Sequence, residues 1–529
     1  MPDTESSQNW KPKFNPWLIA VVVALAAFME ILDTSIANVA LPYISGGLAA
    51  SQDQGTWVLT TYLVANAIVL PITGWVTSLM SRKKFFLICI ALFTASSVLC
   101  GLAPSLPILL MARAFQGIGG GGLQPMAQAI MADVFPPEKR GLAFSVYGLT
   151  AVVAPALGPT LGGWITDNYS WHWIFLINLP VGLLAFVLVT QLVEDPPFLT
   201  RKKLRESRFD YLGFSALALG IAALQIVLDK GQEDDWLSSH FIMTLSIVAF
   251  VCLGFLVVWE WFEKDPIVDV KLFKYTNFMT SFVMMLMIGV VYFSSTILMP
   301  QFLQVLLGYT AEKAGLVVSL GAGLLLVELP IVGLLTNRFP AKYLMAFGWI
   351  VLSGGLYYSV KLVNLQIGFK TAAFIMVMQY LPLAFLFIPA TTASYIGVPR
   401  EKSNSIAGLV NFARNIGSSI GTSLAQTILV RKAQLHQERL SAHTGTGDGV
   451  FESLTNSLSQ YNHLQSGVGK LDAQNGALAQ VYRMLQNQAS MLSYMDAYFL
   501  LALGAGAMFL LSFALRKNDP RTTEQPAAH

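Results

Sequence analysis

Fourteen runs of apolar residues limit the folds that this chain can adopt. A helix needs about 20 apolar residues to cross the hydrocarbon core of a bilayer, which is about 30 Å thick. Inside that core the backbone must satisfy its own hydrogen bonds, which favours helices for runs of this length. The sequence therefore predicts an all-α polytopic membrane protein with fourteen transmembrane helices, at residues 17–41, 55–79, 85–103, 107–133, 141–165, 173–192, 209–228, 238–261, 276–300, 314–336, 341–360, 371–396, 403–430 and 495–515.

The composition supports this class of protein. Hydrophobic residues make up 54% of the 529 residues and charged residues only 12%, whereas soluble domains contain about 25% charged residues. A water-soluble enzyme is therefore not expected. Cys89, Cys100 and Cys252 all lie within apolar runs, so we predict neither a disulfide framework nor a thiolate metal site. The net charge of +3 leaves no large basic domain for nucleic acid.

Lysine and arginine are concentrated on one side of the expected membrane. The two tails and the loops of the same parity hold 22 of these residues. Short loops of the opposite parity hold four: Lys230, Lys313, Lys361 and Lys370. Because cytoplasmic loops carry an excess of positive residues, we expect both termini in the cytoplasm.

The segment 431–494 differs from the short external loops because it is rich in Gln, Ser and Asn. Its stretch 477–492 has a helix-forming composition and some apolar periodicity, which indicates short amphipathic helices. We interpret the segment as an exported arm that docks a partner, and the alternative is a mobile linker that binds nothing. Its histidines are too widely spaced to predict a metal site.

Two similar stretches indicate an internal repeat. The second run ends at residues 70–78 with LPITGWVTS and the tenth ends at residues 329–337 with LPIVGLLTN, and each is followed by a basic turn. We infer two six-helix bundles in the same orientation, an organisation that permits rocking about a site near the midplane. The expected divisions are a tail (1–16), a first bundle (17–192), a linker with two inserted helices (193–275), a second bundle that includes the arm (276–515), and a tail (516–529).

Four motifs carry a family resemblance. They read LDTSIANVALP at residues 32–42, RAFQGIGG at 113–120, GPTLGG at 158–163 and WHWIFLINLP at 171–180. Together they resemble the major facilitator superfamily, specifically the 14-helix drug:proton antiporters of the EmrB/QacA type (DHA2). The resemblance extends over nearly the whole chain. It implies a major facilitator fold with two six-helix bundles plus two inserted helices.

The loop after the second run departs from the superfamily pattern. That pattern usually reads G-x-L-a-D-R-x-G-R, but Ser78 replaces the acid, Leu79 the first arginine and Ser81 the second glycine. The charge relay usually assigned to this loop therefore does not carry over to Ser78. The positions that do carry over are Gly74, Arg82 and Lys83.

Two ionisable residues in the apolar runs are predicted to form a pair. A charge inside a bilayer costs roughly 2.5 to 3.5 kcal/mol, so each such residue indicates a functional site. Asp33 lies eight residues before the external end of the first run, and Arg113 lies six residues after the external start of the fourth. These positions correspond to depths of about 12 and 9 Å. The resemblance implies that the two helices are adjacent and that the acid is a proton or substrate-charge site with the arginine as its partner.

Three further charged residues lie in apolar runs. Glu30, one turn before the acid of this pair, is either a second proton site or a structural hydrogen-bonding group. Glu328 and Arg414 are the corresponding charged residues of the second bundle. Together with Asn411 and Asn415, Arg414 either binds a substrate anion or braces the inner gate, and we favour the brace.

The glycine motifs have a structural interpretation. Gly158 and Gly162 lie one turn apart on one helix face, which allows close helix approach, and Pro159 between them permits a kink. We expect them to shape the moving interface between the two bundles. Ala154 stands where the antiporter signature usually has its leading glycine. The remaining structural candidates are Gly117 and Gly163.

A wide, adaptable apolar cavity is expected from the 19 Met and 33 Phe residues. Its candidate lining residues are polar-tipped or aromatic, although most residues of these types pack helices or face lipid. They are Asn38, Trp57, Tyr62, Asn66, Gln116, Gln124, Gln128, Tyr147, Tyr292, Phe293, Glu328, Gln379, Tyr380, Asn411 and Arg414.

The resemblance implies a transporter of the bacterial inner membrane that exports hydrophobic or amphipathic compounds in exchange for protons by alternating access. No cofactor or metal is expected, because the proton motive force supplies the energy. An EmrA-type periplasmic adaptor and a TolC-type outer-membrane channel are the implied partners, with the 431–494 arm as the docking surface. Two alternatives remain: an uptake symporter of the same fold, and a membrane-embedded enzyme or sensor.

Overall fold

The computed structural model describes residues 12–196, 210–442, 444, 449–467 and 469–514. Within these ranges the chain is helical and contains no strand. Most of the expected N-terminal tail, the 516–529 tail and most of the loop at 193–208 lie outside the described residues.

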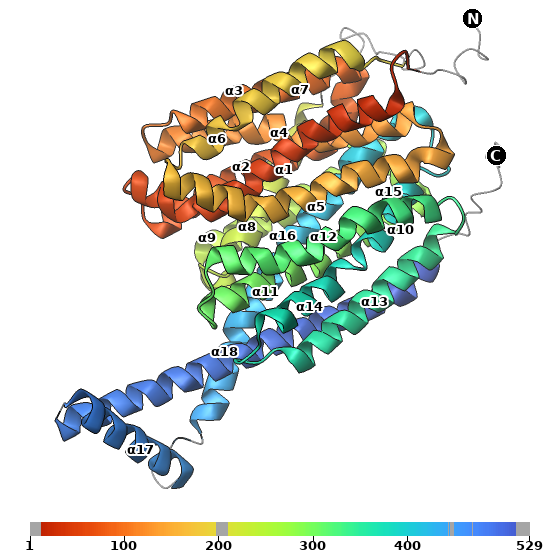
Figure 1. Cartoon of the computed structure of the whole chain (residues 1–529). Helices are drawn as coiled ribbons and strands as arrows, with labels where there is room; N and C mark the ends of the chain where they lie inside the picture. Colours follow the sequence, from red (N-terminus) through yellow and green to blue (C-terminus); the bar gives the residue numbers. More distant parts are fainter. Residues whose placement is uncertain (1–11, 197–209, 443, 445–448, 468, 515–529) are drawn as a thin grey trace, which may run out of the picture.

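The first bundle contains the helices α1 to α7 (Figure 1). Serines start two of these helices, because the Ser51 and Ser81 side chains accept hydrogen bonds from backbone N–H groups of the first turn. The element α6 is a single short turn that leads into α7. The bounds are α1 (Pro16–Gly47), α2 (Gln52–Leu79), α3 (Arg82–Gly101), α4 (Leu106–Val134), α5 (Pro137–Asn168), α6 (Trp173–Leu176) and α7 (Asn178–Leu192).

The second bundle contains α10 to α15, most of α16 and the last part of α18. Its first membrane helix includes a π-helical segment, η3 (Ile288–Phe293), between α10 (Thr276–Met287) and α11 (Ser294–Val305). Such π segments are rare and often occur at functional sites. The other helices are α12 (Ala311–Leu335), α13 (Ala341–Leu362), α14 (Phe369–Tyr380), α15 (Leu383–Ser394), α16 (Ser403–Ser441) and α18 (Lys470–Leu511).

A pair of helices, α8 (Tyr211–Lys230) and α9 (His240–Phe262), connects the two bundles. α8 packs against α2 of the first bundle and α16 of the second, whereas α9 packs mainly on α8. Only 17% of the apolar stretch of α9 is buried, as expected for a helix whose surface faces lipid. The short 3₁₀ segments are η1 (Trp236–Ser238), η2 (Val270–Lys274), η4 (Arg400–Lys402) and η5 (Ser512–Ala514).

Twelve helical segments in the described residues are long and apolar enough to cross a membrane. They correspond to twelve of the fourteen predicted runs. The other two runs form α4 and α16, which are long enough, with 29 and 39 residues. Their many polar residues lower the hydropathy, so the count of fourteen stays a prediction.

The arm is a helical hairpin that projects from the bundle (Figure 1). It comprises the end of α16, the helix α17 (Gly449–Ser466) and the start of α18. Because α18 has 42 residues, its length is about 63 Å at 1.5 Å per residue. The last apolar run was expected to begin near residue 495, but the helix begins at Lys470, since the intervening residues also favour a helix. The arm projects from the end of the bundle opposite the two termini.

Close contacts join the two bundles at the end that bears the termini. The side chain of Asn404 on α16 donates a hydrogen bond to Thr77 Oγ1 on α2, at 2.7 Å. A Cβ atom added at Gly408 would lie 2.4 Å from the Leu70 carbonyl oxygen. On the other side of the interface, a Cβ atom at Gly333 of α12 would lie 2.9 Å from the carbonyl oxygen of Gly141 on α5. The molecule is therefore tightly packed between the bundles at this end.

Candidate functional site

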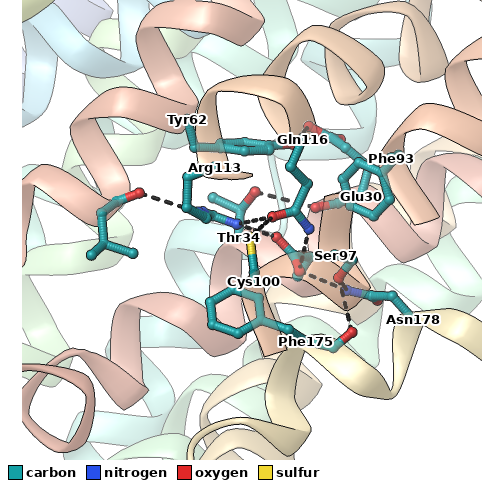
Figure 2. A network of polar contacts seen from close by, with 12 residues as sticks. Glu30, Thr34, Tyr62, Phe93, Ser97, Cys100, Arg113, Gln116, Phe175 and Asn178 are labelled. Carbon is teal, nitrogen blue, oxygen red and sulfur yellow. Dashed lines mark hydrogen bonds and ion pairs between the residues drawn. The ribbon is translucent and has the colours of Figure 1, made fainter. Parts of the chain in front are cut away.

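A buried polar cluster in the first bundle surrounds Asp33 of α1 (Figure 2). Arg113 Nη1 on α4 lies 2.7 Å from Asp33 Oδ2. Two amides donate to the other carboxylate oxygen, Gln116 at 2.9 Å and Asn178 at 2.6 Å. Each of these four residues is at most 2% exposed. The cluster therefore joins α1, α4 and α7 through one carboxylate.

Arg113 is held by more than its ion pair. Its Nε donates to the Val58 carbonyl oxygen at 3.1 Å, and Nη1 also donates to Gln116 Oε1 at 2.7 Å. The guanidinium carbon lies 4.3 Å from the centre of the Tyr62 ring, which adds a cation–π contact (Figure 2). The predicted pairing of Asp33 with Arg113 is present in the structure.

Glu30 forms a separate cluster one helical turn away. Its Oε1 accepts hydrogen bonds from Tyr62 at 2.8 Å and from Asn66 at 3.1 Å, both on α2. Its Oε2 accepts a short hydrogen bond from Gln124 Nε2 on α4. Both carboxylate oxygens of Glu30 therefore have neutral donors from the first bundle.

Gln124 connects this cluster to the second bundle. Its Oε1 accepts hydrogen bonds from the Tyr147 hydroxyl on α5, at 2.7 Å, and from Arg414 Nη2 on α16. Asn411, one turn before the arginine, donates to Gln128 Oε1 at 2.8 Å. One amide side chain thus links a carboxylate of one bundle to a guanidinium of the other.

A cavity of about 690 Å³ lies between the two bundles and α8. Glu30, Thr34 and Asn38 of α1 line one wall, and residues of α2, α5, η3 and α16 line the others. It extends past the end of α8 to Gln232 and Glu233, away from the termini. Because the opposite end is tightly packed, the cavity reaches from the middle of the bundle towards the end that bears the arm.

The structure brings some of the predicted cavity residues together and places others elsewhere. Those that line the cavity are Asn38, Tyr62, Asn66, Gln124, Phe293 and Arg414, together with Glu30 and Arg113. Those outside its lining are Trp57, Gln116, Gln128, Tyr147, Tyr292, Glu328, Gln379, Tyr380 and Asn411.

Several of the residues outside the lining are packed inside the second bundle. The rings of Tyr292 and Tyr380 meet edge to face, with centres 5.9 Å apart. Gln379 is fully buried. Glu328 Oε2 is buried without a hydrogen-bond partner among the described residues. These groups do not reach the cavity between the bundles.

The structural candidates of the first bundle pack mainly against their own bundle. Gly158 and Gly162 lie against Ser35 and Ile36 of α1, so they do not shape the interface between the bundles as expected. The reason is that α5 turns another face, with Gly141, towards α12. Of the other glycines, Gly74 approaches Ser405 on α16, Gly117 approaches the backbone of Tyr62, and Gly163 has open space.

An ion pair and two hydrogen bonds fix the loop after α2 to neighbouring helices. Arg82 forms a buried ion pair with Asp133 at the end of α4. The backbone N–H of Lys83 donates to Asp195 Oδ1 at 3.0 Å, and its Nζ donates to the Thr190 carbonyl oxygen at 2.6 Å. Both retained basic residues thus anchor this loop to α4 and to the end of α7.

Sequence reasoning missed the part of the cavity formed by α8. Gln225, Leu228 and Asp229 line it from this helix, and Ser418 to Gln426 of α16 contribute further polar side chains. A signal was present, because Gln225 and Asp229 are four residues apart in an otherwise apolar helix and therefore share a face. Asn178, which donates a hydrogen bond to the Asp33 carboxylate, was also missed as a site residue.

Comparison with known proteins places this geometry in a family. The model of the Major Facilitator Superfamily matches residues 23–422. The chain is 36% identical to the multidrug export protein EmrB of Escherichia coli strain K12 over 499 residues, which cover 94% of each protein. It is also 36% identical to the fatty acid resistance protein FarB of Neisseria gonorrhoeae over 444 residues, covering 84% of this chain and 86% of FarB.

Solved structures share the fold at low sequence identity. The proton:xylose symporter XylE superposes with a TM-score of 0.58 and 14% identity, over 96% of this chain and 97% of XylE. The human organic anion transporter MFSD10 superposes with a TM-score of 0.56 and 11% identity, over 93% of this chain and all of MFSD10. The fold and the matched sequence agree, and the chain belongs to the major facilitator superfamily, among the EmrB-type transporters.

Proposed function

We propose that this protein exports hydrophobic or amphipathic compounds across the bacterial inner membrane in exchange for protons, by alternating access. The similarity to EmrB, whose name describes multidrug export, supports drug-like substrates. The cavity between the bundles has room for a drug-sized molecule, since such sites usually measure about 300 to 1,000 Å³.

The observation that carries proton coupling is the ion pair of Asp33 and Arg113 at the cavity wall. Arg113 lines the cavity, whereas Asp33 lies behind it with all three donors directed at its carboxylate. A proton on Asp33 would remove the negative charge that holds Arg113 and would weaken the junction of α1, α4 and α7. Loading and unloading of this proton would therefore change how firmly the first bundle is held together around the cavity.

Gln124 connects the buried acids of the first bundle to the second bundle, because it bonds both Glu30 and Arg414. We call this connection the Gln124 bridge. Separation of the two bundles would break the hydrogen bond of Arg414 to Gln124, because the two residues lie on opposite sides of the interface. Glu30 would then keep its donors from the first bundle and lose its connection to Arg414. In this proposal Glu30 acts either as a second proton site or as the structural end of the bridge.

The proton motive force is sufficient for such a cycle. One charge that moves through the membrane potential provides about 2.3 kcal/mol per 100 mV. In an antiporter, substrate leaves the cell as protons enter it. A symporter with the same fold would accumulate substrate along with the inward proton gradient.

Drug transport in everted membrane vesicles with Asp33→Asn tests the proposal. The amide keeps the size of the side chain but cannot exchange a proton, so we expect proton-driven uptake of a fluorescent drug into the vesicles to fall at least tenfold, about 1.4 kcal/mol. Asp53→Asn is the matched control, because this exposed acid of α2 does not line the cavity. Proton-driven transport that survives in the Asp33 variant would remove the assignment.

A partnership is also part of the proposal. We infer that the 431–494 arm contacts an EmrA-type periplasmic adaptor, which would continue to a TolC-type outer-membrane channel. The length of the projecting hairpin and its exposed apolar residues support a docking surface more than a linker that binds nothing.

A further inference from the structure

The cavity has a third wall that belongs to neither bundle. The outer end of α8 lies beside both α2 and α16. On the way from the tightly packed end, Asn415 of α16 donates a hydrogen bond to Asn66 of α2 at 3.4 Å. Beyond it, Gln225 of α8 donates to Ser419 of α16 at 2.9 Å. α8 therefore closes the side of the cavity where α2 and α16 no longer meet.

One carboxylate on this wall, that of Asp229, faces the cavity with few groups around it that offset its negative charge. Asp229 lines the cavity and is exposed to it, and its one hydrogen-bond partner among the described residues is the Thr60 hydroxyl on α2. The neighbouring Lys230 offsets its charge only in part, since the Lys230 Nζ is also engaged by Glu233 and Thr56 and lies 3.9 Å from an Asp53 carboxylate oxygen. Asp229 is thus an acid open to a ligand.

The other acids that line the cavity are occupied. Both oxygens of Glu30 accept hydrogen bonds from side chains of the first bundle. Glu233 forms an ion pair with Lys230. The two arginines that line the cavity are held elsewhere, Arg113 by Asp33 and Arg414 by Gln124. Among the acids that line the cavity, Asp229 therefore has the fewest side-chain hydrogen bonds to give up to a positive ligand group.

A second observation on the facing helix also points to a ligand. Ser423 of α16 lines the same cavity and is only 6% exposed. Its hydroxyl is buried and has no hydrogen-bond partner among the residues that the structure describes. A buried polar group of this kind is costly unless something satisfies it. Between the two helices, the apolar side chains of Leu59, Leu63, Leu228 and Phe293 complete the lining.

We propose that the outer half of the cavity, between α8 and α16, is a binding site for lipophilic cations, with Asp229 as the counter-charge and Ser423 as a polar contact. This inference rests on the proposed export function and names one of its substrate classes. The positive group of the ligand lies against Asp229, and its apolar body lies against the leucines and Phe293. The inserted helix α8 therefore has a direct part in substrate recognition.

Binding of tetraphenylphosphonium to the purified protein in lipid nanodiscs tests the site. We expect Asp229→Asn to lower the affinity for this cation at least tenfold relative to that for an uncharged hydrophobic dye measured on the same samples. Asp229→Glu, which keeps the charge, should restore most of the lost affinity. Asp167→Asn removes an exposed charge at the end of α5, outside the lining of the cavity, and its affinity should equal that of the parent protein.

Three results would overturn the site. They are unchanged cation affinity in Asp229→Asn, an equal loss of affinity for the cation and the uncharged dye, and a parent protein that does not bind tetraphenylphosphonium. Failure of the export function would look different. In that case the cation would bind in an Asp229-dependent way, but everted vesicles would show no proton-driven transport of any tested compound.

Discussion

Asp33 and Arg113 illustrate what a single buried residue does in this protein. Neither has contact with bulk water, and each compensates the charge of the other. Glu30 is equally buried but is satisfied by neutral donors, so two acids one turn apart have different surroundings. The difference arises because Arg113 is directed towards α1 at the level of Asp33 by its bond to the Val58 carbonyl oxygen.

Removal of one member of this ion pair should destabilise the protein more than removal of both. Arg113→Gln leaves the Asp33 carboxylate buried without a counter-charge, and breaking a buried pair in this way costs about 3 to 5 kcal/mol. In the double variant Asp33→Asn/Arg113→Gln no charge is left, so much of the stability should return. Thermal unfolding in detergent, followed by tryptophan fluorescence, compares Arg113→Gln, Asp33→Asn and the double variant with the parent protein. Simple additivity of the two losses would contradict the pairing.

At the scale of elements, two helix pairs close one end of the cavity. They are α2 packed on α16 and α5 packed on α12. Close approach at Gly408 and Gly333 lets the backbones of these helices touch. In lipid, the hydrophobic effect does not drive helices together, because the surrounding lipid tails are as apolar as the helix surfaces. Helices associate instead through close packing at small residues of this kind. An exchange cycle requires these contacts to open in each turnover.

A reversible cross-link between α2 and α16 should therefore stop transport. Thr77 and Asn404 are hydrogen-bonded across the interface, at 2.7 Å. We expect Thr77→Cys/Asn404→Cys, once linked by a short bis-methanethiosulfonate reagent that forms a disulfide with each cysteine, to lose transport in vesicles and to recover it after reduction. Cys252 is replaced in this background because the other two native cysteines are buried.

The control for this experiment lies within one bundle. Tyr43 on α1 and Asp167 on α5 are hydrogen-bonded at 2.6 Å, so Tyr43→Cys/Asp167→Cys can be linked in the same way without joining the bundles. Transport should continue in this variant. Continued transport in the linked Thr77/Asn404 variant would show that the two bundles do not separate at this end.

At the scale of the whole molecule, the arm extends the protein far beyond the bundle (Figure 1). It is anchored where His436 and Lys432 of α16 contact Asp496 of α18, at 3.1 and 3.5 Å. The distal part exposes large apolar side chains, including Val450, Leu464 and Leu471, each more than 70% exposed. Exposed apolar residues on a projecting hairpin suit a contact with another protein.

Substitution of these exposed residues should impair docking of a partner but leave transport by the protein itself unchanged. We expect Leu464→Ser/Leu471→Ser to reduce the drug resistance of intact cells, because substrate released by the pump would no longer be passed to an outer-membrane channel. Drug uptake into everted vesicles should remain at the level of the parent protein. A matched control is Tyr211→Ser, an exposed apolar residue at the start of α8, far from the arm. Equal loss in vesicles would mean that the arm serves transport itself.

The apolar runs by themselves determined that this chain forms membrane helices, and the charges at Asp33, Arg113, Glu30 and Arg414 marked positions where polar contacts had to exist. Hydropathy and burial cost are local properties, so the sequence reveals them directly. Only the tertiary structure decided which helix each face meets. It placed Gly158 against α1, continued α18 into the arm, and brought Asp229 to the cavity. The physical reason is that lipid-facing and helix-facing surfaces are both apolar in a membrane protein, so periodicity cannot distinguish them.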